Sequence, residues 1–185
     1  MRAFIAIVPP PEVLEPLVPL LPDLKERWPQ VGWIPPERWH FTVCFLGDVG
    51  DDAVAEIGRQ VSVIAGESSP IAARIGQGGT FPGGRRPRVA WVGVDAPATL
   101  SDLAGRVAGA AKAAGVDADD RPYRPHITMG RVRKEPVPEP DALRALLGAA
   151  QGGAFTVDRL VLYRSHLGPT PRYEELAAWS LGSNL

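Results

Sequence analysis

Two short stretches of the chain share one pattern: Arg38-Trp39-His40-Phe41-Thr42-Val43 and Arg124-Pro125-His126-Ile127-Thr128-Met129. Each reads arginine, any residue, histidine, an apolar residue, threonine and another apolar residue. The alternation of polar and apolar side chains predicts a β-strand, in which successive residues point to opposite faces. The histidine and the threonine of each stretch therefore share a face, roughly 6.6 Å apart along the strand. One phosphate group fits within the reach of such a pair.

The other face of each predicted strand is apolar. We expect Phe41, Val43 and Phe45 to be buried in the first strand, and Ile127 and Met129 in the second. With these side chains in the core, each strand presents one imidazole and one hydroxyl on its free face.

The two motifs lie in halves of the chain that each repeat the order strand, helix, strand, helix, strand. Hydrophobic periodicity, with glycine and proline at the joins, predicts these elements. The expected strands are residues 3–8, 39–46, 70–76, 88–94, 124–132, 154–163 and 173–181, and the expected helices lie near residues 11–28, 51–65, 97–114 and 139–149. We predict one domain over residues 1–185 that is built as two pseudo-symmetric lobes.

The composition is typical of a globular protein. Hydrophobic residues make up 45% of the chain and charged residues 22%, which argues against disorder despite 20 glycines and 20 prolines. A net charge of −1 argues against a protein that coats long nucleic acids, because such proteins need many cations. Cys44 is the only cysteine, which favours a reducing cytoplasm. No apolar run is long enough to span a membrane, and we expect a monomer.

A pseudo-twofold relation between the two halves would bring both His/Thr faces to one cleft from opposite sides. In-line displacement at phosphorus needs one group that takes a proton from water and a second that protonates the departing oxygen. Histidine does either near neutral pH, because its ordinary pKa is about 6.5. The threonine hydroxyls can donate hydrogen bonds to the non-bridging oxygens. The candidate catalytic residues are therefore His40 and His126, and the candidate phosphate-binding residues are Thr42 and Thr128.

Three arginines can add positive charge to this cleft. Arg38 and Arg124 each precede a histidine by two residues, so their parity places them on the same face. Arg131 has the opposite parity and needs a twist or a bulge in its strand to reach the cleft.

Four segments of the chain together resemble one family. They are Arg2-Ala3-Phe4-Ile5-Ala6-Ile7, Trp39-His40-Phe41-Thr42-Val43-Cys44-Phe45-Leu46-Gly47, Phe81-Pro82 with Pro87-Arg88-Val89-Ala90-Trp91-Val92-Gly93-Val94, and Tyr123-Arg124-Pro125-His126-Ile127-Thr128-Met129-Gly130-Arg131. They are similar to the RNA 2′,3′-cyclic phosphodiesterase (LigT-like) branch of the 2H phosphoesterase superfamily, named for its two His-x-Thr/Ser-x motifs. The resemblance spans the whole chain.

The resemblance implies an α+β fold in which two antiparallel sheets face a central cleft, with helices outside. It implies hydrolysis, without metal or cofactor, of the 2′,3′-cyclic phosphate of an RNA end to a 2′-phosphomonoester, and in some members the joining of RNA ends through 2′,5′ linkages. It implies that His126 activates water as general base and that His40 protonates O3′ as general acid. The expected partners are RNA with a cyclic phosphate end, tRNA fragments among them, or nucleotide cyclic phosphates.

Further residues are candidate RNA contacts. Phe81 and Tyr123 flank the predicted loop and the second motif, which makes them candidates for base stacking. Arg88 ends a basic loop that follows two glycines, for which a solvated turn is the alternative interpretation. The resemblance supports Arg131 as an RNA contact. His166 has no threonine or serine two residues later, and we expect it on a loop or at the surface.

Three alternatives stay open. The first is a metallohydrolase that uses both histidines with nearby acids, drawn from Asp48, Asp117, Asp119 and Asp120, although no ligand pair has close spacing. The second is a non-catalytic protein that binds RNA ends. The third keeps the two-histidine chemistry but acts on another substrate, such as ADP-ribose 1″,2″-cyclic phosphate or a 2′,5′-linked oligonucleotide.

Overall fold

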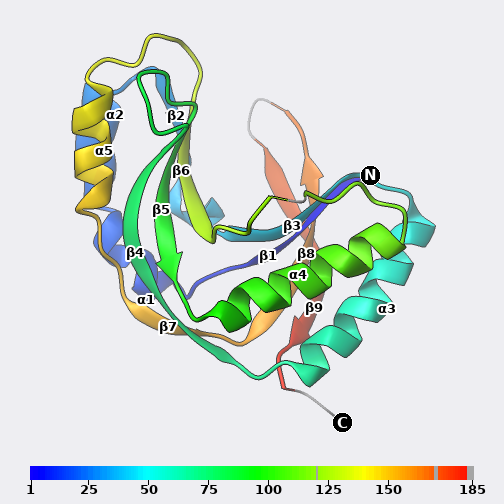
Figure 1. Ribbon diagram of the computed structural model, residues 1–185. Coiled ribbons are helices and arrows are strands. Elements are labelled where there is room, and N and C mark those ends of the chain that lie inside the picture. Colours follow the sequence, from blue (N-terminus) through cyan, green and yellow to red (C-terminus); the bar gives the residue numbers. More distant parts are fainter. Residues whose placement is uncertain (120, 169–170, 183–185) are drawn as a thin grey trace.

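The computed structural model describes residues 1–119, 121–168 and 171–182, and its architecture is α+β, as predicted (Figure 1). The strands are β1 (Arg2–Ile7), β2 (Val31–Trp33), β3 (Phe41–Asp48), β4 (Ile71–Phe81), β5 (Val89–Asp95), β6 (His126–Val132), β7 (Ala154–Val157), β8 (Arg159–His166) and β9 (Arg172–Ser180). The helices are α1 (Pro11–Leu14), α2 (Leu20–Arg27), α3 (Asp51–Glu67), α4 (Ala98–Ala113) and α5 (Pro140–Gly148), and η1 (Glu15–Leu17) and η2 (Pro36–Arg38) are short 3-10 helices.

The strands of the described residues form one curled antiparallel sheet. Its order is β7-β4-β5-β6-β3-β1-β8-β9, and β2 adds to β6 from the side. The pairing between β3 and β6 is short: Phe41 pairs with Ile127. This junction divides the sheet into lobe A (β7, β4, β5, β6 and β2) and lobe B (β3, β1, β8 and β9). The two expected sheets are therefore present as lobes, and the two motif strands join them.

Each lobe takes strands from both halves of the chain. In lobe A, α5 packs against β4 and α2 against β2. In lobe B, α4 packs against β3, and α3 packs against both β9 and α4. Figure 1 shows these two groups of helices at separate places along the curled sheet. Neither half of the sequence builds a lobe alone, because the lobes exchange strands.

Both motif strands contain a bulge at the same position. On β3, Thr42 pairs with Ala6 but Cys44 pairs with Ile5, so Val43 is an extra residue. On β6, Thr128 pairs with Trp91 but Gly130 pairs with Ala90, so Met129 is extra. An extra residue shifts the alternation of faces by one position beyond it. The residue three positions after each threonine therefore returns to the face that carries the histidine.

The bulge on β3 overturns one sequence-based expectation. Phe41 and Val43 are buried, as are Ile127 and Met129 on β6, but Phe45 is 59% exposed. Simple alternation places Phe45 in the core, whereas the extra residue turns it to the face of His40 and Thr42. Cys44 is buried in its place.

Other element predictions failed for identifiable reasons. The expected helix over residues 11–28 is broken into α1, η1 and α2, because prolines recur within it and cannot donate helical hydrogen bonds. The expected strand over residues 154–163 is two strands: β7 pairs with β4 of lobe A and β8 with β1 of lobe B. The short strand β2 was missed, because three residues that include a glycine carry little periodicity.

The edge strand β2 packs closely on β6 because glycine occupies a critical position. Gly130 pairs with Trp33, and a Cβ atom on Gly130 would lie 2.6 Å from Val31 Cγ1 and 2.9 Å from Trp33 Cε3. Real carbon atoms do not approach so closely, so any larger residue would push β2 away. Glycine at this position lets β2 seat on β6.

Among the described residues, no helix has both the length and the apolar character that a membrane crossing requires.

Candidate active site

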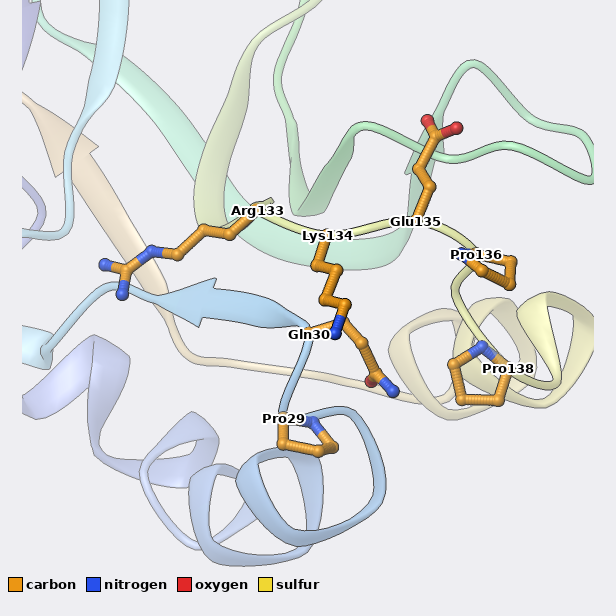
Figure 2. A pocket seen from close by; sticks show the side chains of 7 residues that line it. All are labelled: Pro29, Gln30, Arg133, Lys134, Glu135, Pro136 and Pro138. Atoms are coloured by element: carbon orange, nitrogen blue, oxygen red, sulfur yellow. The ribbon is translucent and has the colours of Figure 1, made fainter.

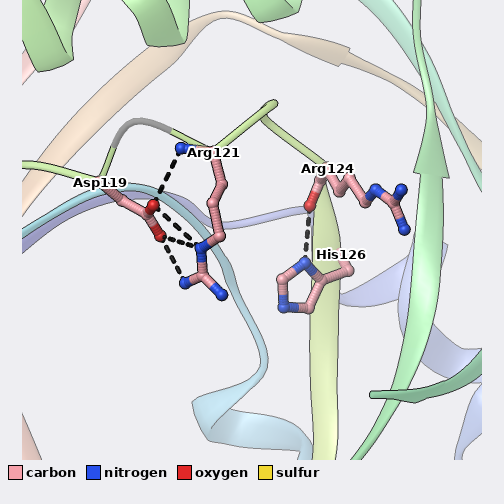
Figure 3. Close-up of polar contacts among 4 residues, drawn as sticks. All are labelled: Asp119, Arg121, Arg124 and His126. Carbon is pink, nitrogen blue, oxygen red and sulfur yellow. Dashed lines mark hydrogen bonds and ion pairs between the residues drawn. The ribbon is translucent and has the colours of Figure 1, made fainter. Parts of the chain in front are cut away.

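The two motif histidines have the same local geometry. His40 Nδ1 lies 2.9 Å from the carbonyl oxygen of Arg38, and His126 Nδ1 lies 2.6 Å from that of Arg124 (Figure 3). A carbonyl oxygen can only accept a hydrogen bond, so Nδ1 carries the proton in each ring. In the neutral imidazole Nε2 is then unprotonated. Each histidine is thus held in the tautomer that can take up a proton at Nε2.

Aromatic rings hold each imidazole in place. His40 stacks on Phe4, with centroids 5.0 Å apart, and meets the edge of Tyr173 at 5.3 Å. His126 meets Phe81 at 5.1 Å in an edge arrangement, and Phe81 stacks on Trp91 at 4.7 Å. Phe4 and Trp91 come from β1 and β5, the strands next to the motif strands, whereas Phe81 and Tyr173 come from β4 and β9 further along the sheet. They limit ring rotation and exclude water from part of each imidazole.

Both motif histidines lie within electrostatic reach of Arg131. Burial lowers the pKa of His40 below 6.5, and the charges of Arg131 and His126 lower this pKa further against an opposing hydrogen bond to Arg38. Burial and the charge of Arg131 likewise lower the pKa of His126. One arginine therefore acts on both imidazoles, and the charge of His126 also acts on His40. The predicted convergence of the two motifs is consistent with this coupling.

The bulge at Met129 explains how Arg131 reaches the site. Without it, alternation would place Arg131 on the face opposite His126 and Thr128. With one extra residue, Arg131 shares their face. The sequence predicted that Arg131 needs a twist or a bulge to reach the cleft, and β6 contains a bulge. On β3 the equivalent position is Phe45, so the two sides of the site differ: one carries a cation and the other an exposed aromatic ring.

Thr42 and Thr128 are both partly exposed, and each follows its histidine by two residues. Their pairing partners, Ala6 and Trp91, lie in the strands that flank the motif strands. The hydroxyl of Tyr123 donates a hydrogen bond to the carbonyl oxygen of Thr42 at 3.1 Å. This contact ties the segment before β6 to β3, and so connects the two motifs.

The other three candidate arginines, Arg38, Arg124 and Arg88, have different surroundings. Arg38 donates a hydrogen bond to the carbonyl oxygen of Pro171 at 2.7 Å, which ties its guanidinium to the segment before β9. Figure 3 shows the side chain of Arg124 directed away from the His126 ring. Arg88 is exposed, and its backbone pairs with Phe81 and Val132. Among the described interactions, the guanidinium charges of these three arginines shift the pKa of neither histidine; Arg38 and Arg124 act on the two rings through their backbone carbonyls alone.

The two aromatic candidates also have distinct surroundings. Phe81 forms part of the wall beside His126. Tyr123 packs against the core, and burial raises the pKa of its hydroxyl. That burial fits a positioning role better than base stacking.

His166 lies at the end of β8 rather than in a loop, and its Nε2 is 2.6 Å from a carboxylate oxygen of Glu174. Of the acids in the metallohydrolase alternative, the three that the structure describes form no metal-binding group with the histidines. Asp119 binds the guanidinium of Arg121 (Figure 3), and Asp120 lies outside the described residues. Among the described residues, no group of three or more His, Cys, Asp or Glu could hold a metal ion.

Sequence reasoning missed several residues of the site. Phe4, Tyr173 and Trp91 contact the histidines, but each lies in a different strand, and only the strand pairing brings them together. Phe45 was assigned to the core for the reason given above. Alternation of faces does not reveal a bulge, so the sequence carried no signal for Phe45.

Comparison with known proteins gives consistent matches. The family described as the 2′-5′ RNA ligase superfamily matches residues 15–169. A protein of Methanothermobacter thermautotrophicus named RNA 2′,3′-cyclic phosphodiesterase is 32% identical, over 98% of this chain and 99% of its own length. A protein of Geobacillus stearothermophilus with the same name is 36% identical over 86% of this chain, and the chain spans half of that relative's length. The crystal structure of TT0787 of Thermus thermophilus superposes with a TM-score of 0.84 at 27% identity, and all of both chains is covered.

Proposed function

The chain is a member of the 2′-5′ RNA ligase superfamily, and from this premise we propose that it hydrolyses the 2′,3′-cyclic phosphate at the end of an RNA to a 2′-phosphomonoester. The resemblance to the 2H phosphoesterases seen in the sequence agrees with the family match. Relatives of the chain carry the name RNA 2′,3′-cyclic phosphodiesterase. The observation that carries the proposal is the pair of motif histidines, each with Nδ1 hydrogen-bonded to a backbone carbonyl, which leaves Nε2 of the neutral ring as the atom that can take up a proton.

The proposed reaction is a single in-line displacement. The oxygen of a water molecule attacks phosphorus while the bond between phosphorus and O3′ breaks. Nε2 of His126 takes a proton from the attacking water, and protonated Nε2 of His40 gives a proton to O3′. The products are a 2′-phosphate and a free 3′-hydroxyl, and one proton has moved from His40 to His126 for return through solvent. The assignment of acid and base follows the family resemblance.

The two coupled histidines suit a reaction that needs one proton on the pair. Because a charge on one imidazole opposes a charge on the other, the singly protonated pair persists over a wider pH range than isolated groups would allow. We assign Thr42 and Thr128 to the non-bridging oxygens, where their hydroxyls donate hydrogen bonds. Arg131 adds positive charge beside the phosphate as negative charge grows in the transition state.

The decisive test offers the purified protein a short RNA with a 2′,3′-cyclic phosphate end and maps the product by phosphorus nuclear magnetic resonance. We expect a 2′-phosphomonoester from wild type. His40→Ala and His126→Ala, each with wild-type circular dichroism, should each lose about 10²- to 10⁴-fold in kcat. Equal turnover by all three folded proteins would refute catalysis by these residues, and a 3′-phosphate product would refute the leaving-group assignment.

A further inference from the structure

A basic groove lies at the end of β6 away from His126, between the turn before β2 and the segment after β6. Its volume is about 550 Å³, and its lining is Pro29, Gln30, Arg133, Lys134, Glu135, Pro136 and Pro138 (Figure 2). A second hollow of about 300 Å³ adjoins it, lined by Lys25, Pro29, Val31, Gly32, Trp33 and Arg133. Pro29 and Arg133 line both hollows, so the two adjoin at these residues. We refer to them together as the Arg133 groove.

The guanidinium of Arg133 lies on the same face of the sheet as Arg131. Gly32 pairs with Arg131, so any Cβ atom on Gly32 would point to the face of Arg131. Such a Cβ atom would lie 2.6 Å from Arg133 Cζ. The guanidinium therefore occupies the space that a side chain at position 32 would fill. The face that carries His126, Thr128 and Arg131 continues into the Arg133 groove.

The groove presents cations that, among the described residues, have no carboxylate within ion-pair distance. Among the described residues, neither Arg133 nor Lys134 forms an ion pair. Figure 2 shows Lys134 extending toward Gln30 while Glu135 points the other way. Lys25 adds a third cation at the second hollow. A chain with a net charge of −1 thus concentrates cations at one end of the strand that carries a catalytic histidine.

We propose that the Arg133 groove binds the phosphodiester backbone of the RNA several nucleotides away from its cyclic end; this rests on the proposed function. Arg133 lies seven positions after His126, and because Met129 is an extra residue, about six steps of roughly 3.3 Å, or about 20 Å, separate them along the strand. The planar guanidinium of Arg133 matches a phosphate diester, and Lys134 and Lys25 add point charges. The proline rings supply apolar surface for riboses or bases without selecting a sequence. An RNA occupant is favoured over an acidic peptide because the groove continues the face on which the reacting phosphate is placed.

The test compares substrates of different length. A cyclic mononucleotide reaches only the histidines, whereas a ten-nucleotide RNA with a cyclic phosphate end also reaches the groove. We expect Arg133→Ala/Lys134→Ala to keep kcat/KM within twofold on the mononucleotide, and to lose roughly tenfold on the long RNA at moderate salt, mostly through KM. Each lost phosphate contact should also reduce the slope of log(kcat/KM) against log[salt] by about 0.7. Arg59→Ala/Arg74→Ala removes two exposed arginines outside the groove and is the matched control.

Gly32→Ala is a second variant that keeps every charge. The new methyl group displaces the guanidinium of Arg133, so we expect an intermediate loss on the long RNA and none on the mononucleotide. Equal losses on both substrates, or no loss on either by the double variant, would overturn the proposal. Fluorescence anisotropy with a ten-nucleotide RNA that ends in a 2′-phosphate gives a readout independent of turnover. If wild type is inactive but binds this RNA through the groove, the proposed reaction fails and the groove assignment stands; if wild type and double variant bind it equally, the groove assignment fails.

Discussion

Arg131 and Thr128 share one face of β6 although three positions separate them, because Met129 is an extra residue in the pairing with β5. A bulge at Val43 likewise turns Phe45 to the face of Thr42 on β3. Each motif therefore contributes three side chains to the site: a histidine, a threonine and the residue three positions later. Because that third residue is a cation on β6 and a phenylalanine on β3, the two sides of the site interact differently with a substrate.

The acid and the base can be distinguished by the leaving group. A p-nitrophenyl phosphodiester departs without protonation, so the general acid becomes dispensable and the general base does not. We expect His40→Ala to retain most of the wild-type rate on this ester while losing about 10²- to 10⁴-fold on the cyclic phosphate. His126→Ala should lose activity on both substrates. The reverse pattern would exchange the two assignments.

Activity on a cyclic mononucleotide should have a bell-shaped dependence on pH. Burial and Arg131 lower the pKa of both histidines below 6.5. The form with one proton on the pair is therefore most abundant on the acidic side of pH 6.5, and kcat/KM, which reports the free enzyme, should be maximal there. Initial rates between pH 4.5 and 8.5 at fixed ionic strength test this. A maximum well above pH 6.5 would contradict the lowered pKa values.

Substitution of Arg131 should move that pH profile. Its positive charge lowers the pKa of His40 and His126, so Arg131→Ala should raise both pKa values and shift both limbs to higher pH. Arg131→Lys keeps the charge and should leave the profile near its wild-type position while reducing kcat/KM, because a lysine lacks the forked geometry. A profile unchanged in Arg131→Ala would show that this arginine does not lie beside the histidines.

The threonine hydroxyls should matter in the transition state. Thr42→Val and Thr128→Val keep the shape and the strand propensity but remove a donor, and each should lower kcat by about 10²- to 10³-fold, as loss of an oxyanion donor does. Thr42→Ser and Thr128→Ser retain the donor and should recover most of the rate. Steady-state kinetics with all four variants checks this. If valine and serine variants behave alike, the hydroxyls have no part in the reaction.

Stability should fall as the pH falls below about 6.5. The folded-state pKa of both histidines is lower than the ordinary value of 6.5, so below this pH the unfolded chain binds more protons than the folded chain. The free energy of unfolding is then at its full value above pH 6.5 and decreases as the pH drops through the folded-state pKa values. Urea unfolding at several pH values measures this slope. The double variant His40→Gln/His126→Gln should lose part of the slope.

The sequence predicted the chemistry of the site better than its geometry. The motif pattern predicted both histidines and both threonines as site residues, because alternation in a strand links residue spacing to a common face, and their roles stay a prediction. It could not reveal the bulges, since one extra residue leaves no mark on local composition. Arg131 and Phe45 thus depended on strand pairing, and so did Phe4 and Tyr173, which only the pairing of distant strands brings to His40.

The fold has the same dependence on long-range strand pairing. Strand and helix periodicity indicated an α+β protein with two lobes. It could not predict which strands belong to which lobe. Asp158 separates β7 of lobe A from β8 of lobe B. Periodicity over residues 154–163 is continuous across that position, so the crossing from one lobe to the other is determined by long-range pairing alone.

The exchange of strands between the lobes has a consequence during synthesis on the ribosome. β1 pairs with β3 early in the chain, but its other edge waits for β8, which is translated more than 150 residues later. Until then the nascent chain carries an open strand edge, which is a template for aggregation. Lobe B therefore completes its folding late, and conditions that slow translation or crowd nascent chains should reduce the yield of active protein.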